Sequence, residues 1–198
     1  MTTFAALGLN KTLQANLKRI GYKKPTYIQE HSIGAVLSGT DTYAIAPTGT
    51  GKTAAYLLPT LQELSQHDHS EAQVRPIRGL FLVPTRELAQ QVHDSINLYG
   101  KDLGLRTISI FGGVRIASQI NRFKRGSDII VATPKRLIDL IKSKAITLAH
   151  IEHFVMDEAD RLVSMGIHQE LRSILEQIPK KAQKVLFSAT DSKALAKF

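Results

Sequence analysis

The stretch Ala46-Pro47-Thr48-Gly49-Thr50-Gly51-Lys52-Thr53 decides most of what this sequence predicts. It follows the short apolar run Tyr43–Ile45 and precedes a helical pattern, which places it at a strand-to-helix turn. Glycines leave room for backbone N–H groups to converge on phosphate oxygens, and the N-terminus of the following helix attracts the same charge. Lys52 can bridge the β- and γ-phosphates, and the Thr53 hydroxyl can join a magnesium shell. The stretch therefore predicts a phosphate-binding loop, or P-loop.

A strict P-loop has glycine where this chain has Ala46, so the loop alone leaves open a glycine-rich turn with a chance lysine. The acidic stretch Asp157-Glu158-Ala159-Asp160 adds to the case, because it ends a second apolar run, Phe154–Met156. Consecutive side chains diverge, so one of Asp157 and Glu158 can hold a metal while the other orients the attacking water. Alone, the acidic stretch would favour a solvated strand end. Together, the two stretches predict a magnesium–nucleoside triphosphate site.

Length and composition bound the class of protein. A chain of 198 residues suits one domain, which buries roughly 70% of its unfolded surface. The net charge of +9 fits a polyanionic partner, although a soluble basic surface explains such a charge as well. Cysteine is absent, no apolar run approaches the roughly 18–20 residues of a membrane span, and the start Met1–Phe4 is no signal peptide. We expect a soluble cytoplasmic protein with no membrane partner, and a monomer.

The apolar runs alternate with helical patterns along the chain. Helical faces of apolar residues repeat between short β-branched runs, which favours an α/β fold with a mostly parallel central β-sheet and helices on both faces. Pro59 falls inside the helix after the P-loop, where we expect a kink or a boundary. The polar segment His67–Arg75 predicts an exposed loop. The strand-like runs are Tyr43–Ala46, Leu80–Val83, Thr107–Phe111, Ile129–Ala132, Phe154–Met156 and Val185–Phe187.

The P-loop stretch and the acidic stretch Asp157–Asp160 together resemble the DEAD-box ATP-dependent RNA helicases, whose P-loop has alanine as its first residue. Within that family, the sequence most resembles bacterial members. Further motifs of that family occur in the expected order. They are the Q motif at Gly21–Gln29 with Phe4 as its isolated upstream aromatic, motif Ia at Pro84–Ala89, the glycine doublet Gly112-Gly113, motif Ib at Thr133–Arg136 and motif III at Ser188–Thr190. The match runs from Phe4 to Thr190, nearly the whole chain.

The resemblance implies a RecA-like P-loop domain over residues 1–198, with the Q motif at 2–30, that binds ATP and Mg²⁺. Gln29 would read the adenine edge with Tyr22 stacked on the ring, Asp157 would hold magnesium through water, and Glu158 would be the catalytic base. The remaining roles follow from the motifs. Catalysis is implied for Lys52, Asp157, Glu158, Ser188 and Thr190, the metal for Thr53 and Asp157, and nucleotide contacts for Phe4, Tyr22, Lys24, Gln29, Ala46, Pro47, Thr48, Gly49, Thr50, Gly51, Lys52 and Thr53.

The same resemblance implies an RNA path over three loops. Glycines let a sugar–phosphate strand approach, helix N-termini offer N–H groups, and arginines pair with phosphates, so little sequence preference is expected. Thr85 and Thr133 could equally be helix caps. The implied RNA-binding residues are Pro84, Thr85, Arg86, Gly112, Gly113, Thr133, Pro134 and Arg136.

The chain departs from the family pattern at three places. Lys135 stands where the family usually has glycine, and it adds a positive charge near the implied RNA path. Val163-Ser164 replaces the commoner leucine–aspartate, a change that we expect to matter little. After Thr190 the sequence is short before the helix-like Ala194–Phe198, so we expect a shortened or altered final helix.

The family's second RecA-like lobe has no counterpart in this sequence. In the family, the second lobe supplies arginines to the ATPase site, and losing such arginines costs about 10³–10⁵ in rate. We therefore expect the lobe formed by this chain to bind nucleotide weakly and to be nearly inactive. Two other classes stay open, an RNA- or protein-binding module and a DNA-directed P-loop translocase. Gln29 and the Thr133-Pro134 pair argue against the translocase. The particular RNA substrate and the cellular pathway are not specified by these residues.

Overall fold

The computed structural model describes residues 2–67 and 74–191. Within them, six strands form one sheet in the order β1-β6-β5-β2-β4-β3, and every pair of neighbours is parallel. This confirms the predicted α/β class and each of the six predicted strands to within two residues at either end. The strands are β1 (Thr42–Ile45), β2 (Gly79–Leu82), β3 (Thr107–Ile110), β4 (Ile129–Ala132), β5 (His153–Met156) and β6 (Gln183–Ser188).

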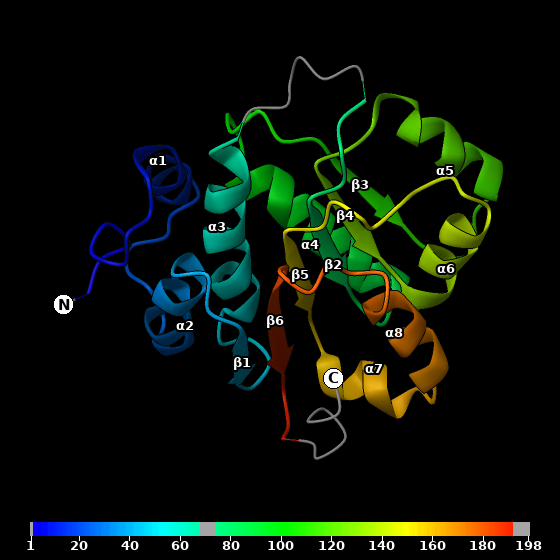
Figure 1. Ribbon diagram of the computed structural model, residues 1–198. Coiled ribbons are helices and arrows are strands. Elements are labelled where there is room, and N and C mark those ends of the chain that lie inside the picture. Colours follow the sequence, from blue (N-terminus) through cyan, green and yellow to red (C-terminus); the bar gives the residue numbers. More distant parts are fainter. Residues whose placement is uncertain (1, 68–73, 192–198) are drawn as a thin grey trace.

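Helices connect the strands and cover both faces of the sheet. In Figure 1, α1, α2 and α3 lie to the left of the sheet, and α5, α6 and α8 lie to its right. The described helices are α1 (Lys11–Arg19), α2 (Tyr27–Leu37), α3 (Lys52–Ser65), α4 (Arg86–Tyr99), α5 (Ile116–Arg122), α6 (Pro134–Lys142), α7 (Ala159–Ser164) and α8 (His168–Leu175), with a 3₁₀ turn η1 (Phe123–Arg125) after α5. None of them is long and apolar enough to cross a membrane.

Two apolar cores fill the space between the sheet and its helices. Successive strand residues point to opposite faces, so Phe81 and Val83 join the core under α1–α4, while Leu80 and Leu82 join the core under α6–α8. A strand buried on both faces has to be apolar at every position, which is why β2 and β4 read as unbroken apolar runs.

The order of the strands divides the loops at the carboxyl edge into two groups. The P-loop, motif III and the acidic stretch follow β1, β6 and β5, which are three adjacent strands. Motif Ia, the glycine doublet and motif Ib follow β2, β3 and β4, which form the other half of the sheet. The arrow of β6 points to the bottom of Figure 1, so this loop-bearing edge is the lower one. The border between the groups runs between β5 and β2, where Asp157 N–H donates to Leu82 O at 3.1 Å.

Of the kink or boundary expected at Pro59, the boundary is wrong and the kink stays a prediction. Helix α3 continues through Pro59 to Ser65. Leu57, Leu58 and Leu61 around the proline are fully buried, and this packing holds the helix together although proline cannot donate its backbone hydrogen bond. The interior of the predicted loop His67–Arg75, residues 68–73, lies outside the described residues, as does the expected final helix Ala194–Phe198.

Candidate functional site

The P-loop turns from β1 into α3 with two glycines in the left-handed region of backbone space. Gly49 has φ 83° and Gly51 has φ 92°. At Gly51 a Cβ atom would lie 2.5 Å from Gln29 Nε2 and 3.1 Å from Thr26 Oγ1, whereas at Gly49 it would meet nothing within 4 Å. Gly51 is therefore required twice, for its backbone conformation and for the close approach of α2.

Gln29 joins the start of α2 to the P-loop. Its side-chain oxygen accepts from Thr26 N–H at 3.0 Å, and its amide donates to Gly51 O at 3.1 Å. The residue is only 1% exposed, so both ends of its amide are committed to the protein in this arrangement. The structure thus places Gln29 beside the P-loop, while the reading of adenine by Gln29 stays a prediction.

Lys52 lies folded back within its own loop. Its ammonium donates to Ala46 O at 2.6 Å and to Ser188 O at 3.4 Å, and the residue is 9% exposed. Ala46 N–H also donates to Ser188 O at 3.0 Å. Motif III and the P-loop are therefore tied together at the ends of the neighbouring strands β1 and β6.

Asp157 follows β5 and is buried at 5% exposure. One of its carboxylate oxygens accepts from the Tyr56 hydroxyl at 2.7 Å, and the other accepts from Glu158 N–H at 2.8 Å. Burial raises the pKa of Asp157, and these two bonds with the nearby charge of Lys52 offset that rise only in part. Asp157 is thus joined to α3, the helix that also carries Thr53 one turn before Tyr56.

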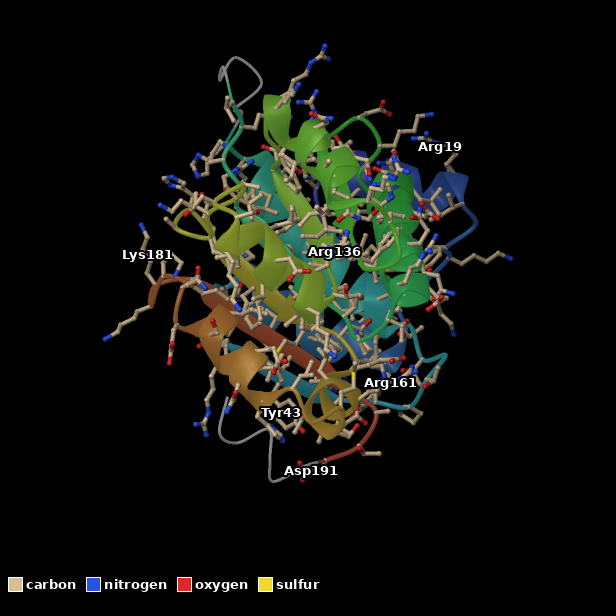
Figure 2. All side chains as sticks on the ribbon, turned by 90° about the vertical axis from the view of Figure 1, so that its right-hand side faces the viewer. Arg19, Tyr43, Arg136, Arg161, Lys181 and Asp191 are labelled. Carbon is tan, nitrogen blue, oxygen red and sulfur yellow. The ribbon has the colours of Figure 1, made fainter. Side chains whose placement is uncertain are left out.

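Glu158 has a backbone conformation that is rare for a residue other than glycine. Its φ is 48° and its ψ is 49°, and it is the residue that precedes α7. Such strain costs about 1–3 kcal/mol and tends to occur at functional sites. Its carboxylate accepts from Arg161 Nη1 at 3.2 Å, and Figure 2 shows Arg161 near the lower edge of the molecule. The Glu158 carboxylate is thus held by Arg161 of α7.

Motif III meets the last residue of the acidic stretch. Thr190 donates to Asp160 Oδ2 from its hydroxyl at 2.7 Å and from its N–H at 3.1 Å, while Ser188 Oγ donates to Thr190 O at 2.6 Å. Partial burial acts to raise the pKa of Asp160, but the bonds from Thr190, from Arg161 N–H and from the Ser188 hydroxyl outweigh it and lower that pKa. Thr190 thus joins motif III directly to Asp160, and Ser188 supports Thr190.

Two of the aromatic residues of the Q motif region, Phe4 and Tyr22, pack against each other, whereas Tyr27 is exposed. Phe4 is 7% exposed, and its ring lies 6.3 Å from that of Tyr22. The Tyr22 ring also lies 6.0 Å from the ring of Tyr99 at the end of α4, and the two hydroxyls are 3.0 Å apart. Lys24 is exposed. Phe4 thus packs against Tyr22, and the stacking of Tyr22 on adenine stays a prediction.

The loops after β2, β3 and β4 border a groove of about 320 Å³. Six of the eight residues predicted to bind RNA line it, together with Lys135, whose side chain is exposed. Met165 and Ile167, from the segment between α7 and α8, close another side of the groove. The six are Pro84, Arg86, Gly112, Thr133, Pro134 and Arg136.

The two arginines of this groove have different surroundings. Arg86 is exposed, and its guanidinium lies 4.9 Å from the centre of the Phe111 ring. Arg136 has a side chain only 13% exposed, and it donates to Val114 O at 3.0 Å and to Gln119 Oε1 at 2.9 Å. Figure 2 shows Arg136 in the middle of this face. Arg136 therefore fixes the segment after the glycine doublet, whereas Arg86 keeps most of its donors for a ligand.

The alternative of plain helix caps holds for one of the two threonines. Thr85 Oγ1 accepts from Leu88 N–H at 3.1 Å and caps α4, whereas the Thr133 side chain makes no such bond to α6. The Thr133 side chain thus has no capping role to compete with a ligand in the groove.

The family model described as DEAD/DEAH box helicase matches residues 26–198. The chain belongs to this helicase family. Its sequence is 40% identical over 186 residues to the DEAD-box ATP-dependent RNA helicase 42 of Arabidopsis thaliana, covering 92% of this chain and 16% of that protein. It is also 40% identical over 187 residues to the DEAD-box ATP-dependent RNA helicase CshA of Streptococcus pneumoniae, covering 94% of this chain and 34% of that protein. The plant and the bacterial relative are thus equally similar to it.

This helicase domain also matches a solved structure of a DEAD box protein from the hyperthermophile Methanococcus jannaschii. The TM-score is 0.90 at 32% identity, over 100% of this chain and 52% of the other. The match confirms the RecA-like fold. The chain spans about a third or less of the length of the two named relatives and about half of the solved structure.

Sequence patterns missed several residues of this helicase domain, because their partners are distant in the chain. Tyr56 was not singled out by any sequence pattern, yet it bonds to Asp157. Gln119 is 2% exposed and donates to Phe111 O at 3.1 Å, which supports the Arg136 contact. A tyrosine at the position one turn after the P-loop lysine is the only sequence signal that could have pointed to such a contact.

Proposed function

We propose that this chain is the ATP-binding lobe of an ATP-dependent RNA helicase that couples ATP hydrolysis to local unwinding of an RNA duplex. The single observation that supports this most is the contact of three motifs at one sheet edge. Lys52, Asp157 and Ser188 come from positions far apart in the chain, and each contacts a residue of another nucleotide motif or of the helix that follows it. The names of the relatives supply the substrate class.

In this proposal, the chain's own residues divide the work on ATP. The P-loop backbone holds the phosphates, and the Lys52 ammonium exchanges its carbonyl partners for phosphate oxygens. Glu158 orients the attacking water and accepts its proton. Ser188 and Thr190 connect Asp160 to the strand end beside the P-loop. In this proposal, that connection couples ATP hydrolysis to RNA binding.

Magnesium fits the donors that the chain provides. A carboxylate and a hydroxyl are oxygen donors of the kind this ion prefers, and Asp157 and Thr53 supply them beside the P-loop. Thr53 and Asp157 would hold the ion, which would neutralise phosphate charge at that place. Because both oxygens of Asp157 already accept a hydrogen bond, we propose that Asp157 contacts the ion through water.

RNA would lie in the groove bordered by the loops after β2, β3 and β4. Exposed Arg86 and Lys135 offer cations for phosphates, and the glycine doublet lets a strand approach the backbone closely. Contacts of this kind carry little sequence information. We propose RNA rather than DNA because the relatives are named as RNA helicases; binding of single-stranded DNA with equal affinity in competition would instead favour a DNA-directed translocase.

We further propose that this lobe alone binds nucleotide weakly and hydrolyses ATP very slowly, because a second RecA-like lobe of the full-length protein completes the site. We place the protein in the cytoplasm and this lobe as a monomer; the absence of cysteine fits a reducing compartment.

Calorimetric titration of the chain with Mg-ADP, Mg-ATP and Mg-GTP tests the nucleotide site. Adenine-selective binding that is lost in Lys52→Ala and Gln29→Ala is the expected result. No binding of any nucleotide at millimolar concentration would overturn the proposed site. RNA-stimulated turnover of ATP by this chain alone would contradict the proposed need for a second lobe.

A further inference from the structure

Tyr56 lies on α3 one turn after Lys52, and it is fully buried. Its ring packs between Phe81 of β2 and Phe187 of β6, with ring centres 6.0 and 5.3 Å away. Because β5 lies between β2 and β6 in the sheet, the ring extends across β5. This aromatic packing fixes the direction in which the hydroxyl points.

The Tyr56 hydroxyl donates to Asp157 Oδ2 at 2.7 Å, and Thr53 lies one turn before Tyr56 on α3. Asp157 Oδ1 accepts from Glu158 N–H at 2.8 Å, so the carboxylate is fixed at both oxygens. Each carboxylate oxygen can accept a second hydrogen bond, so Asp157 retains acceptors for water around a metal.

We propose that Tyr56 is a positioning residue that sets the Asp157 carboxylate relative to Thr53 for magnesium–nucleotide binding. The inference rests on the proposed function, because it concerns the same site. Residues that hydrogen-bond a metal-binding carboxylate orient it, and their loss typically lowers metal affinity about 10–100-fold. The contact is proposed to pass through water here, so we expect a smaller effect.

The test compares ADP affinity with Mg²⁺ and with EDTA, by calorimetry, for the unchanged chain and for Tyr56→Phe. Phenylalanine keeps the ring between Phe81 and Phe187 and removes only the hydroxyl. The ADP affinity with Mg²⁺ divided by that with EDTA should fall about three- to tenfold in Tyr56→Phe. The ADP affinity in EDTA should stay the same. An Asp157→Asn variant should show no further fall of this ratio when Tyr56→Phe is added to it.

Thr60→Val is the matched control, because it also removes a buried hydroxyl from α3, and within the described residues that hydroxyl has no partner. The ratio for Thr60→Val should equal that of the unchanged chain. If the Tyr56 hydroxyl were merely structural, Tyr56→Phe would lower the melting temperature and leave the magnesium ratio unchanged. That result would overturn this inference but not the proposed function. If the unchanged chain bound no ADP, the proposed function and the inference would both fail.

Discussion

The Thr190 hydroxyl donates to Asp160 Oδ2 at 2.7 Å, and this bond joins the end of β6 to the first turn of α7. It is one of the bonds that lower the pKa of Asp160. A carboxylate with a depressed folded pKa contributes stability above its unfolded pKa, and that stability is lost as pH falls through the folded pKa.

Replacing Thr190 by valine should therefore destabilise the chain at pH 7 and not at low pH. Asp160 is partly exposed and screened by solvent, so the expected loss at pH 7 is below about 1 kcal/mol. Melting temperatures between about pH 7 and pH 3 test this, with Thr190→Ser, which keeps the hydroxyl, as the control. A deficit in Thr190→Val that is equally large at both ends of the range would contradict the assignment.

Gly51→Ala should destabilise the chain more than Gly49→Ala. Both positions have positive φ and impose a left-handed strain of about 1–2 kcal/mol on alanine. Only at Gly51 does the new Cβ also meet Gln29 Nε2, at 2.5 Å, so the Gln29 amide has to shift and its bond to Gly51 O is disturbed. Thermal unfolding of the two variants side by side measures the difference, and equal losses would show that the Gln29 contact yields freely.

Thr60→Val should stabilise the chain. The Thr60 hydroxyl is fully buried on α3 and has no hydrogen-bond partner among the described residues, which costs about 1–3 kcal/mol. Valine has nearly the same shape and no polar atom, so we expect a gain of about 1 kcal/mol, or roughly 2–4 °C in melting temperature. Thr60→Ala, which also removes the hydroxyl but leaves a cavity, should gain less. A lower melting temperature for valine would mean that the hydroxyl does have a partner.

Asp128→Ala should be far more harmful than Arg78→Met. Asp128 is 1% exposed and accepts from Arg75 at 2.7 Å, from Arg106 N–H at 2.8 Å and from Arg78 at 3.2 Å. Removing the carboxylate leaves the buried Arg78 charge with one weak partner among the described residues, Glu152 at 3.7 Å, and should cost about 3–5 kcal/mol. Removing Arg78 leaves Asp128 with two donors. Urea unfolding of both variants measures these free energies, and a reversed order would contradict this account.

Arg86→Gln should weaken RNA binding by a similar factor for all sequences. Arg86 is exposed in the groove, so its guanidinium is available to one phosphate. Losing one phosphate contact lowers the slope of log affinity against log salt by about 1. Fluorescence anisotropy with unrelated single-stranded RNAs over a salt series measures both quantities. Arg19→Gln, which removes a charge from α1, should leave the slope unchanged; if the two variants behaved alike, only net charge would matter.

The sequence predicts the strands and the motifs well because their signals are local. An apolar run such as Ile129–Ala132 is buried on both faces, and its pattern needs no knowledge of its neighbours. The same holds for the P-loop, whose two glycines are required by the backbone of the turn itself.

Contacts between distant residues could not be predicted in this way. Tyr56 and Asp157 are 101 positions apart, and Lys52 and Ser188 are 136 apart, so only the folded sheet brings them together. Pro59 does not end α3, for the opposite reason. The tertiary packing of α3 outweighs the lost hydrogen bond, and no window of sequence contains that packing.

Lys52 gives the nucleotide a competitor inside the chain. Its ammonium already has the Ala46 and Ser188 carbonyls as partners, so a phosphate gains only the difference between two sets of oxygen contacts. In the proposed site, binding is an exchange reaction, which keeps its net free energy modest and leaves the Ser188 carbonyl with Ala46 N–H as its donor. By thermodynamic reciprocity, any event that draws the Ser188 carbonyl away from Lys52 raises the affinity of the loop for phosphate.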